Sequence, residues 1–180
     1  MKQLWPPPPL GLGTPLNLAL GRGWKLSLGL AVAAGVATPP LILVLDRLLF
    51  AGVSMERVRA FVAQPLATRI AIVSYAGITE ELVFRVIIST LVAWLGYLVI
   101  KRQTAAIWLG IAVAAVLFGL AHVANLANVP HPYLRAITLN GIAGVVLGWL
   151  YWRRGFEWAV LAHLIADSVM YLVLPDILLP

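Results

Sequence analysis

The feature that most constrains this chain is a series of long apolar segments, each near the length that crosses a lipid bilayer. A helix needs about 20 apolar residues to span the hydrocarbon core. Five segments come close to that length or exceed it, at residues 26–45, 70–100, 104–124, 134–152 and 157–174. No stretch competes with the period-two alternation of a β-strand. The sequence therefore predicts an all-α integral membrane protein, a compact bundle of about five transmembrane helices.

The composition supports a membrane protein because too few residues are charged to cover a soluble surface. Only 11% of the 180 residues are charged and 62% are hydrophobic, whereas about 25% of a soluble domain is charged. The net charge of +6 comes mostly from basic residues at the ends of apolar segments, where lipid headgroups lie. The expected partner is the lipid bilayer, and no nucleic acid is expected. The chain contains no cysteine, which excludes disulfides, thiolate nucleophiles and cysteine-ligated metals.

The remaining segments predict a simple domain organisation. Residues 1–24 are rich in proline and glycine and predict a tail, while residues 25–180 predict a single membrane-embedded domain. Residues 54–69 place charged and apolar side chains at helical spacing, which predicts a short interfacial helix. The count of Lys and Arg in the loops, with Arg135 taken as a loop residue, favours a cytoplasmic N-terminus by a small difference. We expect the protein to lie in the cell membrane.

Two of the predicted spans are expected to be irregular. The first contains the pair Pro39-Pro40, which predicts a kink or a break because proline cannot donate a helical hydrogen bond. The second, residues 70–100, would extend about 46 Å as one helix, which exceeds the roughly 30 Å of the hydrocarbon core. This span must therefore tilt, project beyond the core or break.

Three charged residues, Glu80, Glu81 and Arg85, interrupt the second span. Left facing lipid they would cost roughly 7–10 kcal/mol on an insertion scale, so they must face the bundle interior and find partners. Glu81 and Arg85 are four residues apart with the acid first, which is the favourable order for a helical ion pair. Glu80 is rotated by about 100° from Glu81 and has no partner on its own helix. An available carboxylate of this kind has the profile of a general base; the alternative is a structural salt-bridge cluster near an interface.

Two histidines lie in other apolar spans. His122 ends the third span with Phe118 four residues before it, and His163 lies in the fifth span with Asp167 four residues after it. Residues four apart share a helix face, so His163 and Asp167 present one polar patch. One buried histidine is more often structural than functional, but two of them with a free Glu and a buried Asp are hard to explain by packing alone. His131, in a loop, is not expected to be catalytic.

Together these patterns resemble the CPBP family of membrane proteases, which includes the type II CAAX prenyl endopeptidases, bacteriocin-processing enzymes and Abi proteins. The family pairs two adjacent Glu with an Arg four residues after the second, a Phe with a His four residues later, and a His with an Asn or Asp four residues later. This sequence matches those patterns at Glu80, Glu81, Arg85, Phe118, His122, His163 and Asp167. Each pattern alone is short, but all three occur in order over residues 68–172, each in a membrane helix.

The resemblance implies an intramembrane endopeptidase that acts on a membrane-associated peptide or protein, with prenylated CAAX-type proteins among the substrates. In the family's glutamate mechanism, the residues matching Glu80 and His122 activate water, and those matching His163 and Asp167 stabilise the oxyanion. An ionised Asp167 only accepts hydrogen bonds, so it is either protonated in that role or orients His163 instead.

The resemblance also implies roles for the supporting residues. Arg85 would orient Glu81 and brace the site, and Phe118 would pack against the site and hold His122.

The resemblance leaves the cofactor open, as none or as zinc. Glu80, His122, His163 and Asp167 are a plausible set of two nitrogen and two oxygen ligands for Zn²⁺, with water as an additional ligand. A zinc-dependent enzyme would be a metalloendopeptidase. The metal-independent mechanism is favoured by a modest margin.

Two other functions are compatible with parts of the pattern. One is a non-catalytic membrane scaffold or chaperone of the same fold, and the other is a small ion-coupled transporter that uses Glu80 and the histidines as a relay. The intact polar set argues against the scaffold, and the lack of an internal repeat argues against the transporter. The chain is short for the family, which is consistent with a minimal bundle or with a homodimer that completes it.

Overall fold

The computed structural model describes residues 23–50, 55–126 and 129–175. These residues form helices and contain no strand, and five helical segments are long and apolar enough to cross a membrane. The predicted all-α membrane fold is therefore confirmed. The predicted tail lies almost entirely outside the described residues.

The elements follow one another along the chain with short connections. In order they are α2 (Trp24–Phe50), α3 (Met55–Val62), α4 (Leu66–Glu81), the π-helix η2 (Leu82–Ser89), α5 (Thr90–Ile100), α6 (Gln103–Ala121), the 3₁₀-helix η3 (Val123–Leu126), α7 (Pro132–Arg154), α8 (Phe156–Ser168) and the π-helix η4 (Val169–Val173).

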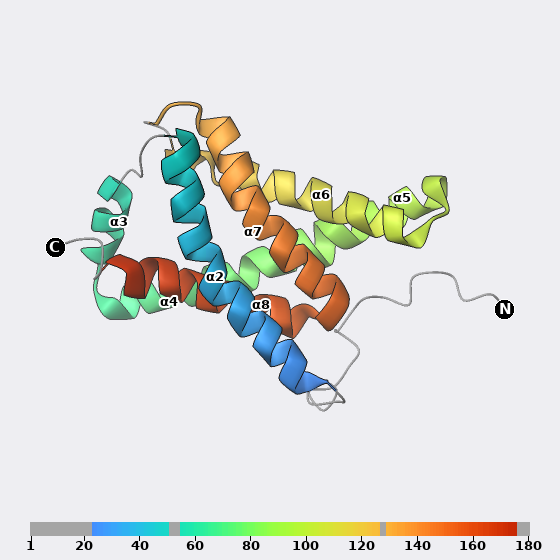
Figure 1. Ribbon diagram of the computed structural model, residues 1–180, viewed down its shortest axis with the longest axis horizontal. Helices are drawn as coiled ribbons and strands as arrows, with labels where there is room; N and C mark the ends of the chain where they lie inside the picture. The colour runs from blue at the N-terminus through green and yellow to red at the C-terminus, as the bar shows by residue number, and fades with distance from the viewer. Residues whose placement is uncertain (1–22, 51–54, 127–128, 176–180) are drawn as a thin grey trace.

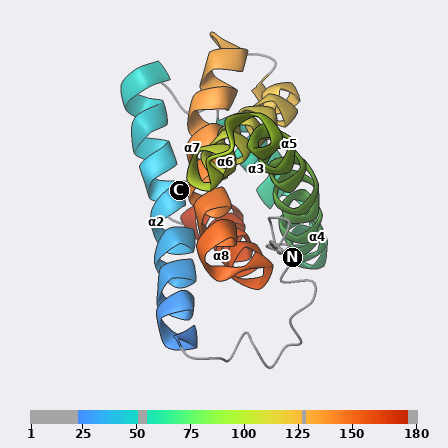
Figure 2. The same cartoon turned by 90° about the vertical axis from the view of Figure 1, so that its right-hand side faces the viewer.

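The packing of these helices places α8 at the centre of one half of the bundle. Helix α8 lies between α2 and α4 and packs against both, as Figure 2 shows. Helices α5 and α6 form an antiparallel pair that extends away from this half, and α6 packs along α7 (Figure 1). As a result, α4 and α8 lie next to each other although about 80 residues separate them in the chain.

The second span differs from the prediction in a way that matters for the site. It is one continuous helical rod of 35 residues, Leu66–Ile100, about 50 Å long at 1.5 Å per residue. Instead of breaking, its middle part, η2, is π-helical. The hydrogen bonds of a π-helix run from residue i to residue i+5, which adds a residue to the turn, and such turns occur often at functional sites. The first span likewise continues unbroken through Pro39 and Pro40, so of the predicted kink or break at this pair, the break is wrong.

Several predicted boundaries are corrected by the structure. The interfacial helix is shorter than residues 54–69, because α3 ends at Val62 and Pro65 precedes α4, which leaves residues 66–69 in the second span. His122 lies just past the last residue of α6 rather than inside the helix.

Arg135 is not a loop residue but part of the first turn of α7, and it is buried with only 3% of its surface exposed. Its Nη2 donates a hydrogen bond to Oδ2 of Asp46 in α2, at 2.5 Å. Its guanidinium also lies over the ring of Phe50, 5.9 Å from the centroid. Each charge is neutralised by the other, which allows both to lie inside an apolar bundle. The pair ties the end of α2 to the start of α7.

Helix α2 approaches α8 closely because Gly35 has no side chain. A Cβ atom at Gly35 would lie 2.6 Å from Cβ of Ile165 and 2.7 Å from the carbonyl oxygen of Ala162. At Gly29, on the same helix, a Cβ would meet no atom within 4 Å among the described residues. A side chain at Gly35 would therefore collide with α8, whereas a side chain at Gly29 would not collide with any described residue.

This difference predicts opposite effects of one methyl group. We expect Gly35→Ala to lower the thermal unfolding midpoint in detergent, because overpacking a close contact costs about 1–3 kcal/mol. The matched control Gly29→Ala should leave the midpoint unchanged or raise it, since alanine is favoured over glycine in a helix by up to about 1 kcal/mol. Equal midpoints for the two variants would contradict the close α2–α8 contact.

Candidate active site

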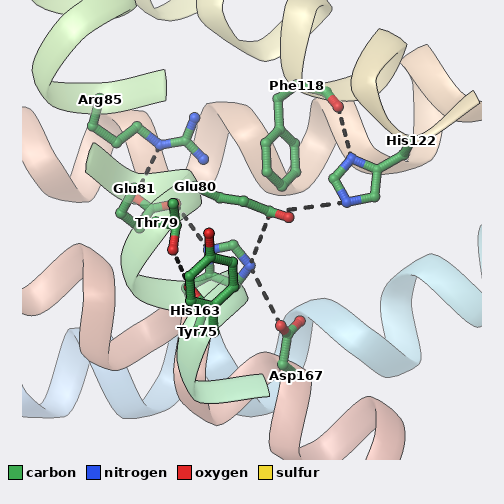
Figure 3. Close-up of polar contacts among 9 residues, drawn as sticks. All are labelled: Tyr75, Thr79, Glu80, Glu81, Arg85, Phe118, His122, His163 and Asp167. Atoms are coloured by element: carbon green, nitrogen blue, oxygen red, sulfur yellow. Dashed lines mark hydrogen bonds and ion pairs between the residues drawn. The ribbon is translucent and has the colours of Figure 1, made fainter. Parts of the chain in front are cut away.

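The polar residues of three helices meet at one place in the bundle, shown in Figure 3. Helix α4 and η2 contribute two Glu and one Arg, α6 and the residue after it contribute a Phe and a His, and α8 contributes a His and an Asp. The structure thus brings together all the residues predicted from the sequence: Glu80, Glu81, Arg85, Phe118, His122, His163 and Asp167.

Glu81 is the buried centre of this group. Its Oε2 lies 3.0 Å from Nε of Arg85, and both side chains are fully buried. The predicted ion pair is therefore present. The other oxygen, Oε1, lies 2.9 Å from Nδ1 of His163. Because the carboxylate accepts, Nδ1 of His163 donates, and the ring is held with Nε2 facing the opposite way.

Phe118 packs against both histidines and against Arg85. The centroid of its ring lies 4.7 Å from that of His122 and 5.9 Å from that of His163. The guanidinium of Arg85 lies 5.1 Å from the same centroid, a cation–π arrangement. Nδ1 of His122 lies 2.8 Å from the carbonyl oxygen of Phe118, which can only accept, so Nδ1 donates and Nε2 faces the site. The predicted contact between Phe118 and His122 is therefore present.

Glu80 differs from its neighbour Glu81 in exposure and in partners. Its side chain is 29% exposed, and its Oε2 lies 3.9 Å from Nε2 of His122 and 3.7 Å from Nε2 of His163. These distances exceed those of direct hydrogen bonds, but a single water oxygen between such groups can bond to both. Glu80 is thus the carboxylate that a small molecule can reach.

Asp167 completes the polar surface on α8. Its Oδ2 lies 3.7 Å from Nε2 of His163, one helical turn earlier, and its side chain is 20% exposed. Together with Glu80, it places a second carboxylate near the nitrogen that Glu81 turns toward the site. His131 contributes nothing here, since it lies exposed before the first turn of α7.

The four candidate zinc ligands hold their donor atoms further apart than the ligands of a tetrahedral zinc centre. Ligand atoms of a tetrahedral site at about 2.0–2.1 Å from Zn²⁺ lie about 3.3 Å apart. Here the donor pairs are 3.7–3.9 Å apart, and the part of the chain that the structure describes contains no group of three or more such side chains arranged to hold a metal ion. The side chains as placed are wider apart than the ligands of a tetrahedral zinc centre, and the zinc alternative stays a prediction.

Sequence reasoning missed two features of the site. One is the contact between Glu81 and His163, which are 82 positions apart, so that no local pattern connects them. The other is the π-helical geometry of η2, which an apolar segment interrupted by one arginine does not indicate. Both depend on how α4, η2 and α8 dock.

The comparison with protein families agrees with this geometry. Residues 61–169 match the family described as type II CAAX prenyl endopeptidase Rce1-like. That range is more than half of the chain and includes every residue of the site. The chain belongs to this family. Membership supports a CAAX-type intramembrane endopeptidase, a membrane hydrolase with a membrane-associated protein as substrate, at the level of the family. No curated protein and no solved structure matches the chain.

Because the two adjacent Glu residues have different surroundings, replacing each with Gln should change the free energy of unfolding by different amounts. We expect Glu81→Gln to lower the free energy of unfolding by about 3–5 kcal/mol, because it leaves the buried Arg85 without a carboxylate. The control Glu80→Gln, at a partly exposed carboxylate that pairs with no arginine, should stay near the wild type. Unfolding in detergent, followed by circular dichroism, measures both. A Glu81→Gln protein as stable as Glu80→Gln would contradict the assigned ion pair.

Proposed function

We propose that this protein hydrolyses a peptide bond of a membrane-associated peptide or protein, with Glu80 and His122 activating the water. The observation that supports this most is the position of Oε2 of Glu80, within 3.7–3.9 Å of Nε2 of both histidines in a partly exposed site. A structural salt-bridge cluster would instead bury its carboxylate against a cation, as Glu81 is buried against Arg85.

The first step is the activation of water. A water between Glu80 and His122 gives a proton to Glu80, which acts as general base, and its oxygen attacks the carbonyl carbon of the peptide. His122 holds this water through Nε2, because its Nδ1 is occupied by the carbonyl of Phe118. When the C–N bond breaks, Glu80 passes the proton to the leaving amine, which balances the reaction.

The second requirement is support for the negative charge on the carbonyl oxygen. His163 is placed for this in its doubly protonated form, because its Nδ1–H donates to Glu81 and its Nε2–H is directed toward Glu80 and Asp167. A donor fixed in place before the reaction stabilises the developing oxyanion without reorganisation. Asp167 supports the same charge as a protonated acid, since an ionised carboxylate has no hydrogen to donate.

The substrate that we propose is a prenylated protein or peptide with a CAAX-type C-terminus. The family to which the chain belongs supports this class, and the helices that carry the site expose apolar side chains such as Ile78, Leu82 and Val83. An apolar surface beside the site suits a substrate that is itself held in the bilayer.

Substitution of the water-activating pair tests the proposal. The purified protein in detergent should cleave a prenylated CAAX peptide or members of a peptide library, with products identified by mass spectrometry. Glu80→Gln and His122→Ala should each reduce the rate about 100-fold or more, since general acid–base catalysis contributes about 10²–10⁴-fold. Glu157→Gln, at an acid in the first turn of α8, is the matched control. Cleavage that survives both site substitutions would rule out the assignment.

A chelator in the same assay separates the two mechanisms. Unchanged cleavage is the expected result. Loss of cleavage that added zinc restores would replace the proposed mechanism with a zinc-dependent one. Absence of cleavage with every substrate tested would favour the scaffold.

The role of Asp167 can be tested by comparing a substitution that keeps its shape without a charge with one that removes the polar group. We expect Asp167→Asn to retain cleavage at or above the wild-type rate, because the amide can donate a hydrogen bond to the oxyanion. Asp167→Ala, which removes the donor, should lose about 10-fold or more in kcat, since removal of one oxyanion donor typically costs about 10²–10³-fold. If Asp167→Asn is as impaired as Asp167→Ala, the carboxylate itself is required, and Asp167 orients His163 instead.

A further inference from the structure

A chain of hydrogen bonds leads to the backbone of Arg85 through two hydroxyls, those of Thr90 and Tyr151, that take no part in the proposed mechanism. Oγ1 of Thr90, the first residue of α5, donates to the carbonyl oxygen of Arg85 at 3.1 Å. The same Oγ1 lies 3.1 Å from the hydroxyl oxygen of Tyr151 in α7. Because the single hydroxyl hydrogen of Thr90 goes to a carbonyl that can only accept, the Tyr151 hydroxyl donates to Thr90. The order is therefore Tyr151, then Thr90, then the backbone of Arg85.

Thr90 binds the carbonyl of Arg85 a second time, through its backbone. Its N–H is shared between that oxygen and the carbonyl oxygen of Ile87, and the bond to Arg85, over five residues, is the one that defines a π-helix. Thr90 thus closes the last wide turn of η2 with both its backbone and its side chain. A π-helical turn is rare, and the hydroxyl of Thr90, which closes this one, contacts a side chain of a different helix, Tyr151 of α7.

The residue at the other end of this turn is the one that braces the site. Arg85 contacts Glu81 at 3.0 Å, and Glu81 contacts His163 at 2.9 Å. If η2 returned to the α-helical register, one residue fewer in the turn would rotate the following helix by about 100° relative to α4. The backbone at Arg85 would then no longer be fixed relative to α7.

We propose that Tyr151 and Thr90 are positioning residues of the active site, which hold η2 in its π-helical register and so hold Arg85 against Glu81. The inference rests on the proposed function, because the group that it positions is His163, through Glu81. Tyr151 is 4% exposed, so removal of its hydroxyl alone leaves a buried ring of nearly the same shape. Its hydroxyl can therefore be tested without opening a cavity.

The experiment removes each hydroxyl and keeps the size of the side chain. Tyr151→Phe and Thr90→Val should each lower kcat about three- to tenfold with KM unchanged, the range expected for one buried hydrogen bond. The loss in kcat of the double variant should be no larger than that of the more impaired single variant, because both hydroxyls belong to one chain of hydrogen bonds. Thr90→Ser, which keeps the hydroxyl, should retain the wild-type kcat. Tyr133→Phe, at a residue of the same helix that is 63% exposed, is the control.

A second measurement distinguishes positioning from general stability and does not depend on cleavage. Hydrogen–deuterium exchange over Leu82–Ser89 should be faster in Tyr151→Phe and Thr90→Val than in the wild type and in Tyr133→Phe. Wild-type kcat in both hydroxyl variants, or a lower thermal midpoint with unchanged kcat, would overturn the inference. If the wild type cleaves no substrate, the proposed function fails, and unchanged exchange over η2 would then overturn the positioning role as well.

Discussion

The rest of the candidate site depends on the two contacts that the carboxylate of Glu81 makes. This carboxylate is fully buried, and its two oxygens face Arg85 on its own helix and His163 on α8. A fully buried carboxylate has no solvent to replace a lost partner, so Glu81 requires both contacts. The same contacts join the second span to the last one. One side chain therefore serves both to hold two helices together and to orient a histidine of the site.

Glu80 and Glu81 are neighbours in the chain, but helix geometry places their side chains in different surroundings. Neighbouring residues of a helix point about 100° apart, so when Glu81 faces the packed interior, Glu80 faces the edge of the site, where 29% of it is exposed. Burial against Arg85 suits a structural carboxylate, and partial exposure between two histidines suits one that exchanges protons. The division requires the helix to be held in one rotation, and Phe118 contributes by packing against Arg85 and both histidines.

The helices that carry the candidate site also pack against α2, which contributes no residue to the site. Helix α2 lies before the matched family region, which begins at residue 61, yet it packs on α8 at Gly35 and is tied to α7 through Asp46 and Arg135. Nothing in the sequence pairs Asp46 with Arg135, which are 89 positions apart. The pair becomes visible only because the end of α2 meets the start of α7, where each charge needs a partner.

The sequence by itself determined the membrane class, four of the five spans to within a few residues, the Glu81–Arg85 pair and the residues that meet in the candidate site. These are local properties: apolar length sets the spans, and a repeat of 3.6 residues per turn sets which neighbours share a face. The tertiary structure alone decided the contact of Glu81 with His163, the π-helical register of η2 and the Asp46–Arg135 pair. Each of these either joins residues on different helices or is contacted by a residue of a neighbouring helix. Their formation depends on how the helices dock, and docking depends on shape and charge across the whole bundle rather than on any local pattern.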